Sequence, residues 1–489
     1  LPASYFSTNF TNGFSGITIG SSTAGAITVG GAVTYNDPLT LKTAGNITMN
    51  NGSSLTGTAG QNASLVLWAD ADAAGGGYIR LGDNAPITTN GGHLWLGGGS
   101  GSAAWNGLTV GDGYAQGTTA LATGIFIDSG SITTNGGNIA MYGKSASGGT
   151  YVVLPDGTSN VSGIYSYFDN NSTTHNYSIN AGTGTIYLKA LGAEDAQHGG
   201  WVGEALYLNG GTLTSAATAG NDAITLIGDA SAVLSERGAG ISLIGWTAND
   251  ANSINATGGG NIVMTGTSTN QQTSQWNPGI RISGYNSITT SGGTGSITLT
   301  GTANDLTAGN SSVRMETDND RITSSGDLIV NGNGKAVDIL GRATVTGTTG
   351  ITAGAQSVTL GNTSNDFGGA VTVVSSGNLS LIDSNTMTLG AVTASGTVDI
   401  ATLTGNLTLT GAVQTTDATA NAIKLNAEKN KAAGDGTGGN IIITGGSVST
   451  GAGGFATLYS GKVADSTGLT ALIGSGSGHF RYNSDEAAS

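Results

Sequence analysis

The stretch Ser131–Gly143 reads SITTNGGNIAMYG, and similar stretches recur along the chain. Copies start at Pro86 (PITTNGGHLWLGG), Ser253 (SINATGGGNIVMTG) and Ser287 (SITTSGGTGSITLTG). Each has a β-branched residue, a short polar step, two or more glycines and an alternating apolar triplet. Self-similarity at a spacing of tens of residues is the signature of stacked repeat units. With three weaker copies included, the leading apolar residues are Ile87, Ile132, Ile179, Leu213, Ile254, Ile288 and Ile322.

A second, shorter apolar phrase precedes most copies, for example Ile125-Phe126-Ile127 and Ile241-Ser242-Leu243. Each repeat therefore contains three short strands, and their period-two alternation indicates one buried face. Gly, Asn and Asp punctuate the strands and accept the backbone angles of tight corners. Strands this short become stable when those of the next repeat stack on them. The sequence predicts an all-β fold, a parallel β-helix (β-solenoid) with three short strands per coil.

The repeat changes character near residue 340. We predict a β-helix with long inserted loops over residues 1–340, and a continuous shaft with short corners and a C-terminal junction segment over 341–489. In the second part, apolar triplets such as Val358-Thr359-Leu360 and Leu379-Ser380-Leu381 follow one another closely. Three such strands would give a coil of roughly 30 residues, and the whole chain roughly 12 to 18 coils.

The composition excludes several classes of protein. The chain has 489 residues with 86 glycines, no cysteine and 9% charged residues, and its formal net charge is -15. Without cysteine there is no disulfide scaffold and no Cys-ligated metal. The acidic balance argues against a nucleic-acid partner, which needs clustered Lys and Arg. No apolar run reaches the ~18 residues of a membrane-spanning helix.

Catalytic and metal-binding patterns are weak. The best candidate for a cation site is Glu316, Asp318 and Asp320 in Glu316-Thr317-Asp318-Asn319-Asp320, with a solvated loop as the alternative. The four histidines show no metal-ligand spacing, and no nucleophile elbow occurs. The glycine-rich Gly97–Ser102 is interpreted as corner and loop glycines. We therefore predict that the chain is not an enzyme and has no cofactor.

The tryptophans are more informative, because all of them precede residue 290. If Leu94 and Leu96 face inward, Trp95 between them faces outward, where it could stack on a sugar ring or on another copy of the chain. The alternative is that loops fold over the rings and form satellite cores. The candidates for ligand stacking are Trp68, Trp95, Trp105, Trp201, Trp246 and Trp276.

The ends of a solenoid are a separate candidate site. An uncovered end coil presents an unpaired strand edge, through which copies could join end to end. The residues expected to cap or join the ends are Leu1, Tyr5, Phe6, Phe480 and Tyr482.

Three segments carry a resemblance to a known family. The segment NTSNDFGGAVTVVSSGNLSLIDSNTMTLGAVTASGTVDI (Asn362–Ile400) resembles the shaft repeats of filamentous-haemagglutinin-like exoproteins. The end, FATLYSGKVADSTGLTALIGSGSGHFRYNSDEAAS from Phe455, resembles the junction that precedes their small β-rich tail modules. The SITTNGGNI phrases are similar to the middle region of the same family. The resemblance covers most of the chain.

The resemblance implies a right-handed parallel β-helix, exported by Gram-negative bacteria through an outer-membrane secretion pore and displayed as an adhesive fibre. The family's amino-terminal secretion domain is not visible, so we expect an internal piece of a larger precursor. The expected partners are other copies of the chain, glycans or proteins on host or neighbouring cells, and the pore during export. The expected location is extracellular, at the cell surface.

Two main functions from different classes follow. The preferred one is a structural and adhesive rod of a secreted bacterial cell-surface fibre, with end-to-end assembly into filaments as a subsidiary form. The alternative is a sugar-binding or polysaccharide-degrading β-helix of the tailspike or lyase type. Catalysis there would need acids and arginines to meet on one face, and the available set is Arg281, Arg314, Glu316, Asp320 and Arg321.

Overall fold

The protein is described by a computed structural model, covering residues 5–10, 12–147, 161–167, 176–193, 203–233, 238–268, 277–304, 311–432, 435–473 and 485–486. The chain forms two compact units. Unit 1 comprises Leu1–Gly295 and Gly301–Asn310, and unit 2 comprises Ser296–Thr300 and Ser311–Ser489. The change from one unit to the other falls within strand β27 (Ile297–Ala303).

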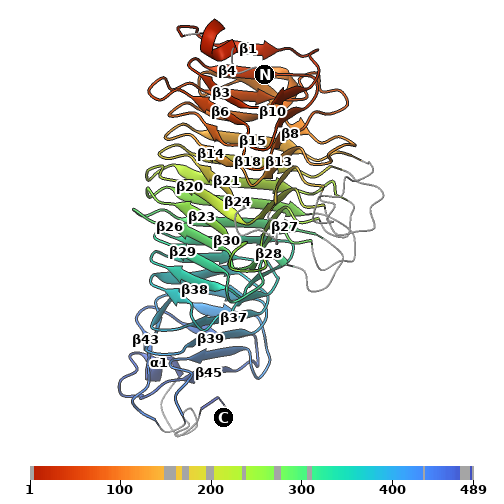
Figure 1. Cartoon of the computed structure of the whole chain (residues 1–489). Coiled ribbons are helices and arrows are strands. Elements are labelled where there is room, and N and C mark those ends of the chain that lie inside the picture. The colour runs from red at the N-terminus through yellow and green to blue at the C-terminus, as the bar shows by residue number, and fades with distance from the viewer. Residues whose placement is uncertain are drawn as a thin grey trace. The chain divides into compact units, whose positions relative to one another are not determined.

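The fold is a right-handed parallel β-helix, as predicted. Its strands form three sheets, named here A, B and C in the order in which each coil visits them. In unit 1 each coil adds one strand to each sheet, except that the coil of β10 adds two further strands beside it, and strands of successive coils lie next to each other (Figure 1). Among the described residues, sheet B has fifteen strands, which agrees with the expected 12 to 18 coils.

Sheet A of unit 1 contains β1 (Ile17–Gly20), β4 (Leu39–Lys42), β7 (Leu65–Trp68), β10 (Leu94–Trp105), β15 (Ile139–Lys144), β18 (Ile186–Leu191), β21 (Asp222–Asp229) and β24 (Asn261–Ser268), with β11 (Leu108–Gly113) and β12 (Ala115–Gln116) beside them. Sheet B contains β2 (Ile27–Val29), β5 (Ile47–Met49), β8 (Ile79–Leu81), β13 (Ile125–Asp128), β16 (Ile164–Tyr167), β19 (Leu206–Asn209), β22 (Ile241–Gly245) and β25 (Ile280–Gly284). Sheet C contains β3 (Ala32–Tyr35), β6 (Ser54–Gly57), β9 (Ile87–Thr88), β14 (Ser131–Thr133), β17 (Tyr177–Asn180), β20 (Gly211–Ser215), β23 (Asn252–Ala256) and β26 (Ser287–Thr290).

The repeat found in the sequence sets the register between coils, because equivalent residues of successive repeats pair with each other. In sheet C, Ile132 pairs with Ile87 on one side and with Ile179 on the other, and the next pairs are Ile179 with Leu213 and Leu213 with Ile254. All of these side chains are fully buried. Identical apolar positions thus stack into columns inside the coils, and burial of each such side chain stabilises the fold by roughly 1.5–3 kcal/mol.

The TTNGG part of the phrase forms the corner between sheets C and A. The Thr134 hydroxyl donates to the Gly137 carbonyl inside the corner. Asn90 and Asn135 take left-handed φ angles of 51° and 54°, which Asn tolerates better than most residues. The Asn135 amide also donates to the Asn90 side-chain oxygen at 2.9 Å, so equivalent corners of adjacent coils are joined.

One hairpin interrupts the regular coils of unit 1. Strand β10 runs on past the sheet and pairs antiparallel with β11 through the turn Asn106-Gly107, whose φ angles are 46° and 77°. The prediction that Gly97–Ser102 forms a corner and loop is therefore wrong, because these glycines lie within β10. Without side chains, they allow β11 to approach the backbone closely: a Cβ on Gly99 would lie 2.5 Å from the Gly113 amide nitrogen.

The strands of unit 2 follow the same order but with one shorter sheet. Sheet B contains β28 (Ser311–Met315), β31 (Ala336–Ile339), β34 (Val358–Leu360), β37 (Leu379–Asp383), β39 (Val398–Thr402), β42 (Ile423–Asn426) and β45 (Ala456–Tyr459). Sheet A contains β30 (Leu328–Asn333), β33 (Thr349–Thr352), β36 (Ala370–Ser375), β38 (Met387–Ala394), β40 (Leu407–Leu409), β41 (Val413–Thr415), β43 (Ile441–Ile443) and β44 (Val448–Ser449). Sheet C contains β29 (Arg321–Ser324), β32 (Arg342–Val345) and β35 (Asp366–Phe367).

The coils of unit 2 are shorter than predicted. Val358 pairs with Leu379, and Leu379 pairs with Val398, so these coils advance by 21 and 19 residues rather than roughly 30. The first of these coils still includes β35 of sheet C, so its small advance comes from short corners between the strands. Among the described residues, sheet C ends at β35. From there on, one long strand, β38, pairs with both β40 and β41, so two strands of a coil follow each other with almost no corner between them.

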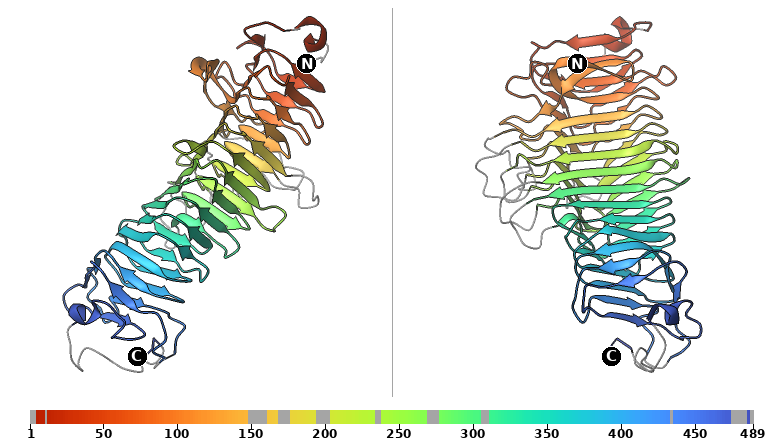
Figure 2. Two further views of the ribbon diagram at one scale, coloured as in Figure 1. Left: turned by 90° about the vertical axis from the view of Figure 1, so that its left-hand side faces the viewer. Right: turned by 180° about the vertical axis from the view of Figure 1, so that it is seen from behind.

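Two short helices complete the description. The π-helix η1 (Tyr5–Asn9) packs against β3 in unit 1, and α1 (Leu469–Ile473) lies against β43 in unit 2 (Figure 2). Among the described residues, neither helix has the length and apolar character needed to cross a membrane.

Candidate functional site

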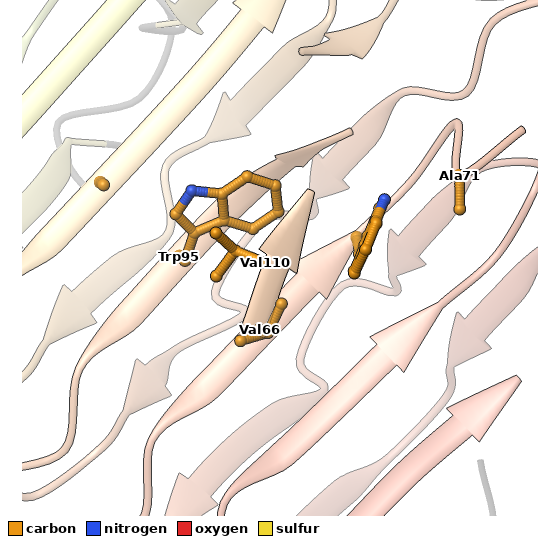
Figure 3. Packing of buried hydrophobic residues seen from close by; sticks show 6 residues of the cluster. Val66, Ala71, Trp95 and Val110 are labelled. Atoms are coloured by element: carbon orange, nitrogen blue, oxygen red, sulfur yellow. The ribbon is translucent and has the colours of Figure 1, made fainter. Parts of the chain in front are cut away.

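Two of the predicted stacking tryptophans are covered by the β10–β11 hairpin. Trp68 and Trp95 are only 3% and 2% exposed, and their rings meet edge to face at 6.4 Å. The Trp68 Nε1 donates to the Gly99 carbonyl oxygen at 2.8 Å, and the Lys42 Nζ lies 3.5 Å from the Trp68 ring centroid. Figure 3 shows Val110 of the hairpin packed near Trp95 and Val66.

Trp95 does point away from Leu94 and Leu96, as predicted, because those two side chains are fully buried on the other face. Of the two alternatives considered for Trp68 and Trp95, the structure supports the second, because the hairpin makes a satellite core over them and they are not open to a stacking ligand. Trp105 is half-buried against the same cluster, with its ring 5.8 Å from that of His93. Burial lowers the pKa of His93. Trp201 and Trp276 lie outside the described residues.

A second aromatic column runs along the outer face of sheet B. The rings of Phe126 and Tyr165 stack at 5.6 Å with an interplanar angle of 9°, and Tyr165 and Tyr207 stack at 5.1 Å. The Arg80 guanidinium lies 5.8 Å from the Phe126 ring centroid. Because Phe126 and Tyr165 are 3% and 2% exposed, the middle of this column is also covered.

The aromatic pair that reaches solvent lies at the corner after sheet B. Trp246 follows β22 and Tyr285 follows β25, and these strands pair in register up to Gly245 and Gly284. The Tyr285 N–H donates to the Gly245 carbonyl oxygen at 3.0 Å, so the two corners lie on adjacent coils of unit 1. The side chains are 56% and 41% exposed. We call Trp246 and Tyr285 the corner pair.

The corner that carries Trp246 is held by a buried carboxylate. Asp250 is fully buried, and its oxygens accept hydrogen bonds from the Trp246 N–H at 3.0 Å and the Thr247 hydroxyl at 2.7 Å, and from the Thr247 N–H. Hydrogen bonds to a charged acceptor are roughly twice as strong as neutral ones. The indole is therefore presented by a fixed loop.

The corner that carries Tyr285 is equally constrained. The Asn286 amide, buried under it, donates to the Leu243 carbonyl at 3.2 Å and the Ser283 carbonyl at 3.0 Å. Gly284 has a φ of 118°, and a Cβ there would lie 1.6 Å from the Gly245 carbonyl oxygen. Only glycine permits this close approach of the two coils.

The predicted cation site in unit 2 is built like the Trp246 corner. Thr247-Ala248-Asn249-Asp250 and Thr317-Asp318-Asn319-Asp320 share the pattern Thr-x-Asn-Asp. Asp320 is fully buried, and its Oδ2 accepts from the Thr317 hydroxyl at 3.0 Å and the Thr317 N–H at 3.3 Å. This carboxylate thus braces its own corner instead of facing outward toward a cation.

The other acids of that segment have different surroundings. Asp318 is exposed, while Glu316 Oε1 lies 3.3 Å from Arg314 Nε. Within the described ranges, no group of three or more His, Cys, Asp or Glu residues could hold a metal ion. Of the remaining residues considered for polysaccharide cleavage, Arg281 is buried in unit 1 and Arg321 is exposed in unit 2.

The predicted end residues divide into buried and exposed. Phe6 is 3% exposed and Tyr5 is 47% exposed. The Phe6 ring lies 5.9 Å from that of Phe10, which is 6.1 Å from that of Phe14. Phe6 therefore acts as a cap on unit 1 rather than as an open joining surface. Leu1, Phe480 and Tyr482 lie outside the described residues.

Sequence reasoning missed Tyr285 and Asp250. The signal for Tyr285 was present in the repeat, because Gly240-Ile241-Ser242-Leu243 and Gly279-Ile280-Arg281-Ile282 place Trp246 and Tyr285 at the same offset. Aligning the repeats beyond the strand would have brought the two aromatic residues together.

A family described as repeats of unknown function (DUF5649) matches residues 308–374 and 376–439. Over these residues, most of them in unit 2, the chain is similar to that family. Comparison with curated proteins and with solved structures gives no match.

Proposed function

We propose that the chain is a structural and adhesive segment of a secreted bacterial cell-surface fibre. The observation that carries this proposal is that the interior and the corners of unit 1 have different roles. Inward columns of Ile, Leu and Val stack coil on coil, while the corners hold side chains such as Trp246 outward on braced loops. A rigid repeat scaffold with outward contact groups is suited to spacing and attachment.

The resemblance to filamentous-haemagglutinin-like exoproteins supports the same proposal, including display at the outside of the cell. The fold also meets the physical demand of export. With no cysteine in the sequence, the chain needs no disulfide to fold after crossing the outer membrane. The proposed partners are surface glycans or proteins of other cells, and further copies of the chain.

Adhesion is tested with the full chain immobilised on polystyrene beads. We expect these beads to remain on cultured epithelial cells or on a bacterial lawn under shear flow, in excess of beads coated with albumin. Retention equal to the albumin control on every surface would contradict an adhesive role. Negative-stain electron microscopy of the same preparation tests self-assembly, for which long fibres with a constant axial repeat are expected.

The second candidate is a polysaccharide-active β-helix, which the exposed Trp246 favours as far as sugar binding is concerned. Binding and cleavage are separated by incubating the chain with a polysaccharide panel and measuring soluble reducing ends. We expect none to appear. Release of reducing ends would replace the structural proposal by an enzymatic one.

A further inference from the structure

We infer that the corner pair, Trp246 and Tyr285, is a shallow platform that binds neutral glycans by stacking their pyranose rings on the indole and the phenol. This inference rests on the proposed adhesive function and names the ligand class that one part of the surface takes. It is argued from exposure, spacing, rigidity and charge.

Exposure sets these two rings apart from the aromatic side chains that pack along the outer faces of sheets A and B. Tyr5 and Phe14, near the start of unit 1, are also exposed, at 47% and 48%. Trp68, Trp95, Phe126 and Tyr165 are all covered and pack on other rings. Within the described part of the chain, no ring contact and no side-chain hydrogen bond is found for Trp246 or Tyr285. Exposed apolar side chains that lie together on the surface can mark a ligand-binding site.

The spacing suits a small ring-shaped ligand. Gly245 and Gly284 are register partners on neighbouring parallel strands, and such strands lie about 4.8 Å apart. The two aromatic residues come one step further along, so they too occupy neighbouring backbone positions. Their backbone separation is comparable to the width of one pyranose ring, whose apolar C–H face stacks on aromatic surfaces.

Two exposed side chains are too small a surface for a stable protein partner. Such an interface buries about 800 Å² on each side and involves about 20–30 residues of each partner. A sugar needs far less, because a few aromatic side chains with nearby polar groups can define its site. The exposed Asn249, close to Trp246, offers an amide to the hydroxyl groups of a glycan.

Charge favours a neutral ligand over an anionic one. The chain has a formal net charge of -15, and Asp250 contributes a buried carboxylate directly under the Trp246 corner. The exposed members of that corner, Trp246 to Asn249, are all uncharged. Uronic-acid or sulfated glycans would meet repulsion without a cation to offset it.

The braced corners reduce the entropic cost of binding. Asp250 fixes the backbone at Trp246 and Thr247, and Asn286 fixes the neighbouring corner. Because the loops are ordered before the ligand arrives, the free energy of stacking is not spent on ordering them. Even so, a platform of two rings binds weakly, and many copies on one fibre would raise the avidity.

The test is affinity gel electrophoresis of the full chain in gels containing dextran, yeast mannan, laminarin or hydroxyethylcellulose, with polygalacturonate as the anionic comparison. We expect retardation in at least one neutral gel. Trp246→Ala should weaken binding at least tenfold, and Tyr285→Ala several-fold. Phe455→Ala is the matched control, since Phe455 is an aromatic residue of unit 2 that is 65% exposed, and it should behave as wild type.

The inference is overturned if no neutral gel retards the wild type, if only polygalacturonate does, or if the doubly substituted chain migrates as wild type does in a binding gel. Circular dichroism and the thermal midpoint confirm that each variant is folded. Bead retention separates this inference from the adhesive function. Retention without retardation in any neutral gel removes the platform but leaves adhesion, whereas Trp246-dependent retardation without bead retention removes adhesion but leaves the platform.

Discussion

Unit 1 uses the same residue type in two opposite ways. Trp68 and Trp95 lie on the outer face of sheet A, yet the β10–β11 hairpin folds over them and leaves them 3% and 2% exposed. Trp246 lies at the corner after sheet B and is 56% exposed. The first two stabilise the coils, and the third is available to a ligand.

The difference comes from the neighbouring chain and not from the coil itself. Trp95 lies near the start of the twelve-residue strand β10, which runs on past the sheet and returns as a hairpin that brings Val110 over the indoles. Beside Trp246, the chain makes a short braced turn at Asp250 and starts β23. An outward position in a β-helix is thus a site only when no inserted segment covers it.

The largest effect on stability is expected when Trp95 is replaced. Replacing Trp95 with Ala removes a buried indole and leaves a cavity under the hairpin, which should lower the free energy of unfolding by about 3–5 kcal/mol. Urea unfolding monitored by circular dichroism measures the loss. Trp246→Ala, measured alongside, serves as the control. A change below about 1 kcal/mol at Trp95 would show that the hairpin is not a core.

The stability of unit 1 should also depend on pH, through the buried carboxyl group of Asp70. Burial, together with the nearby charge of Asp72, raises the pKa of Asp70 to about 6, and its Oδ1 is a buried atom with no hydrogen-bond partner among the described residues. A carboxyl group with a raised folded-state pKa binds its proton more tightly when folded, so its stability contribution is complete below about pH 4 and is lost as pH rises through about 6.

Asp70→Asn should therefore stabilise unit 1 at pH 7.5, by up to about 3 kcal/mol, and flatten the dependence of the thermal midpoint on pH between 4 and 6. Asn also suits the left-handed φ of 49° at this position. The comparison residue is Asp383 of unit 2, whose pKa burial likewise raises to about 6 and which should keep its own pH dependence. An unchanged pH profile in the Asp70 variant would contradict the assignment.

A smaller loss of stability is expected when Asp250, which braces the corner of Trp246, is replaced. Asp250→Ala leaves the Trp246 N–H and the Thr247 N–H without their acceptor, which should cost about 1–3 kcal/mol of stability. Glycan retardation should also fall, although Trp246 itself is intact, because the loop is no longer held. Asp320→Ala, which removes the equivalent buried brace of a corner in unit 2, is the control and should leave glycan retardation unchanged. Full glycan retardation in the Asp250 variant would show that bracing is irrelevant to binding.

The smallest effect on stability is expected at the exposed ring itself. Trp246→Ala should change the free energy of unfolding by no more than about 0.5 kcal/mol, because the residue is 56% exposed and its indole has no ring contact or hydrogen bond among the described residues. Urea unfolding of this variant beside Trp95→Ala compares the stability contributed by an exposed tryptophan with that of a buried one. A loss above about 1.5 kcal/mol would mean that the ring packs against the protein in solution.

Much of the fold was predictable from the sequence because the repeat phrase is the register. The fully buried residues from Ile87 to Ile254 pair in the order in which the phrase aligned them. Local chemistry also explains the corners, where Thr134 and Asn135 of the TTNGG phrase do what their types favour. The coil length of unit 2 was not predictable in this way, since nothing in a short apolar triplet says which sheet it joins.

The candidate site was less predictable, because the exposure of an outward residue depends on segments inserted between the strands and not on the repeat itself. Alternation correctly placed Trp95 on the outer face, but exposure depended on whether a segment folds back over it. The turn Asn106-Gly107 is a strong hairpin signal that was available in the sequence and was not used. The acids around Asp320 illustrate the same limit, because a carboxylate that braces a corner and one that binds a cation have similar sequence patterns.

The spacing between register partners in sheet C has a further consequence. It is 45 residues from Ile87 to Ile132, 47 from Ile132 to Ile179, and 34 from Ile179 to Leu213, yet each pair meets in register. Added residues are thus absorbed between strands and are not transmitted to the core. Such a scaffold can carry foreign peptides between its strands as cargo, and its surface can diversify by insertion while its interior stays constant.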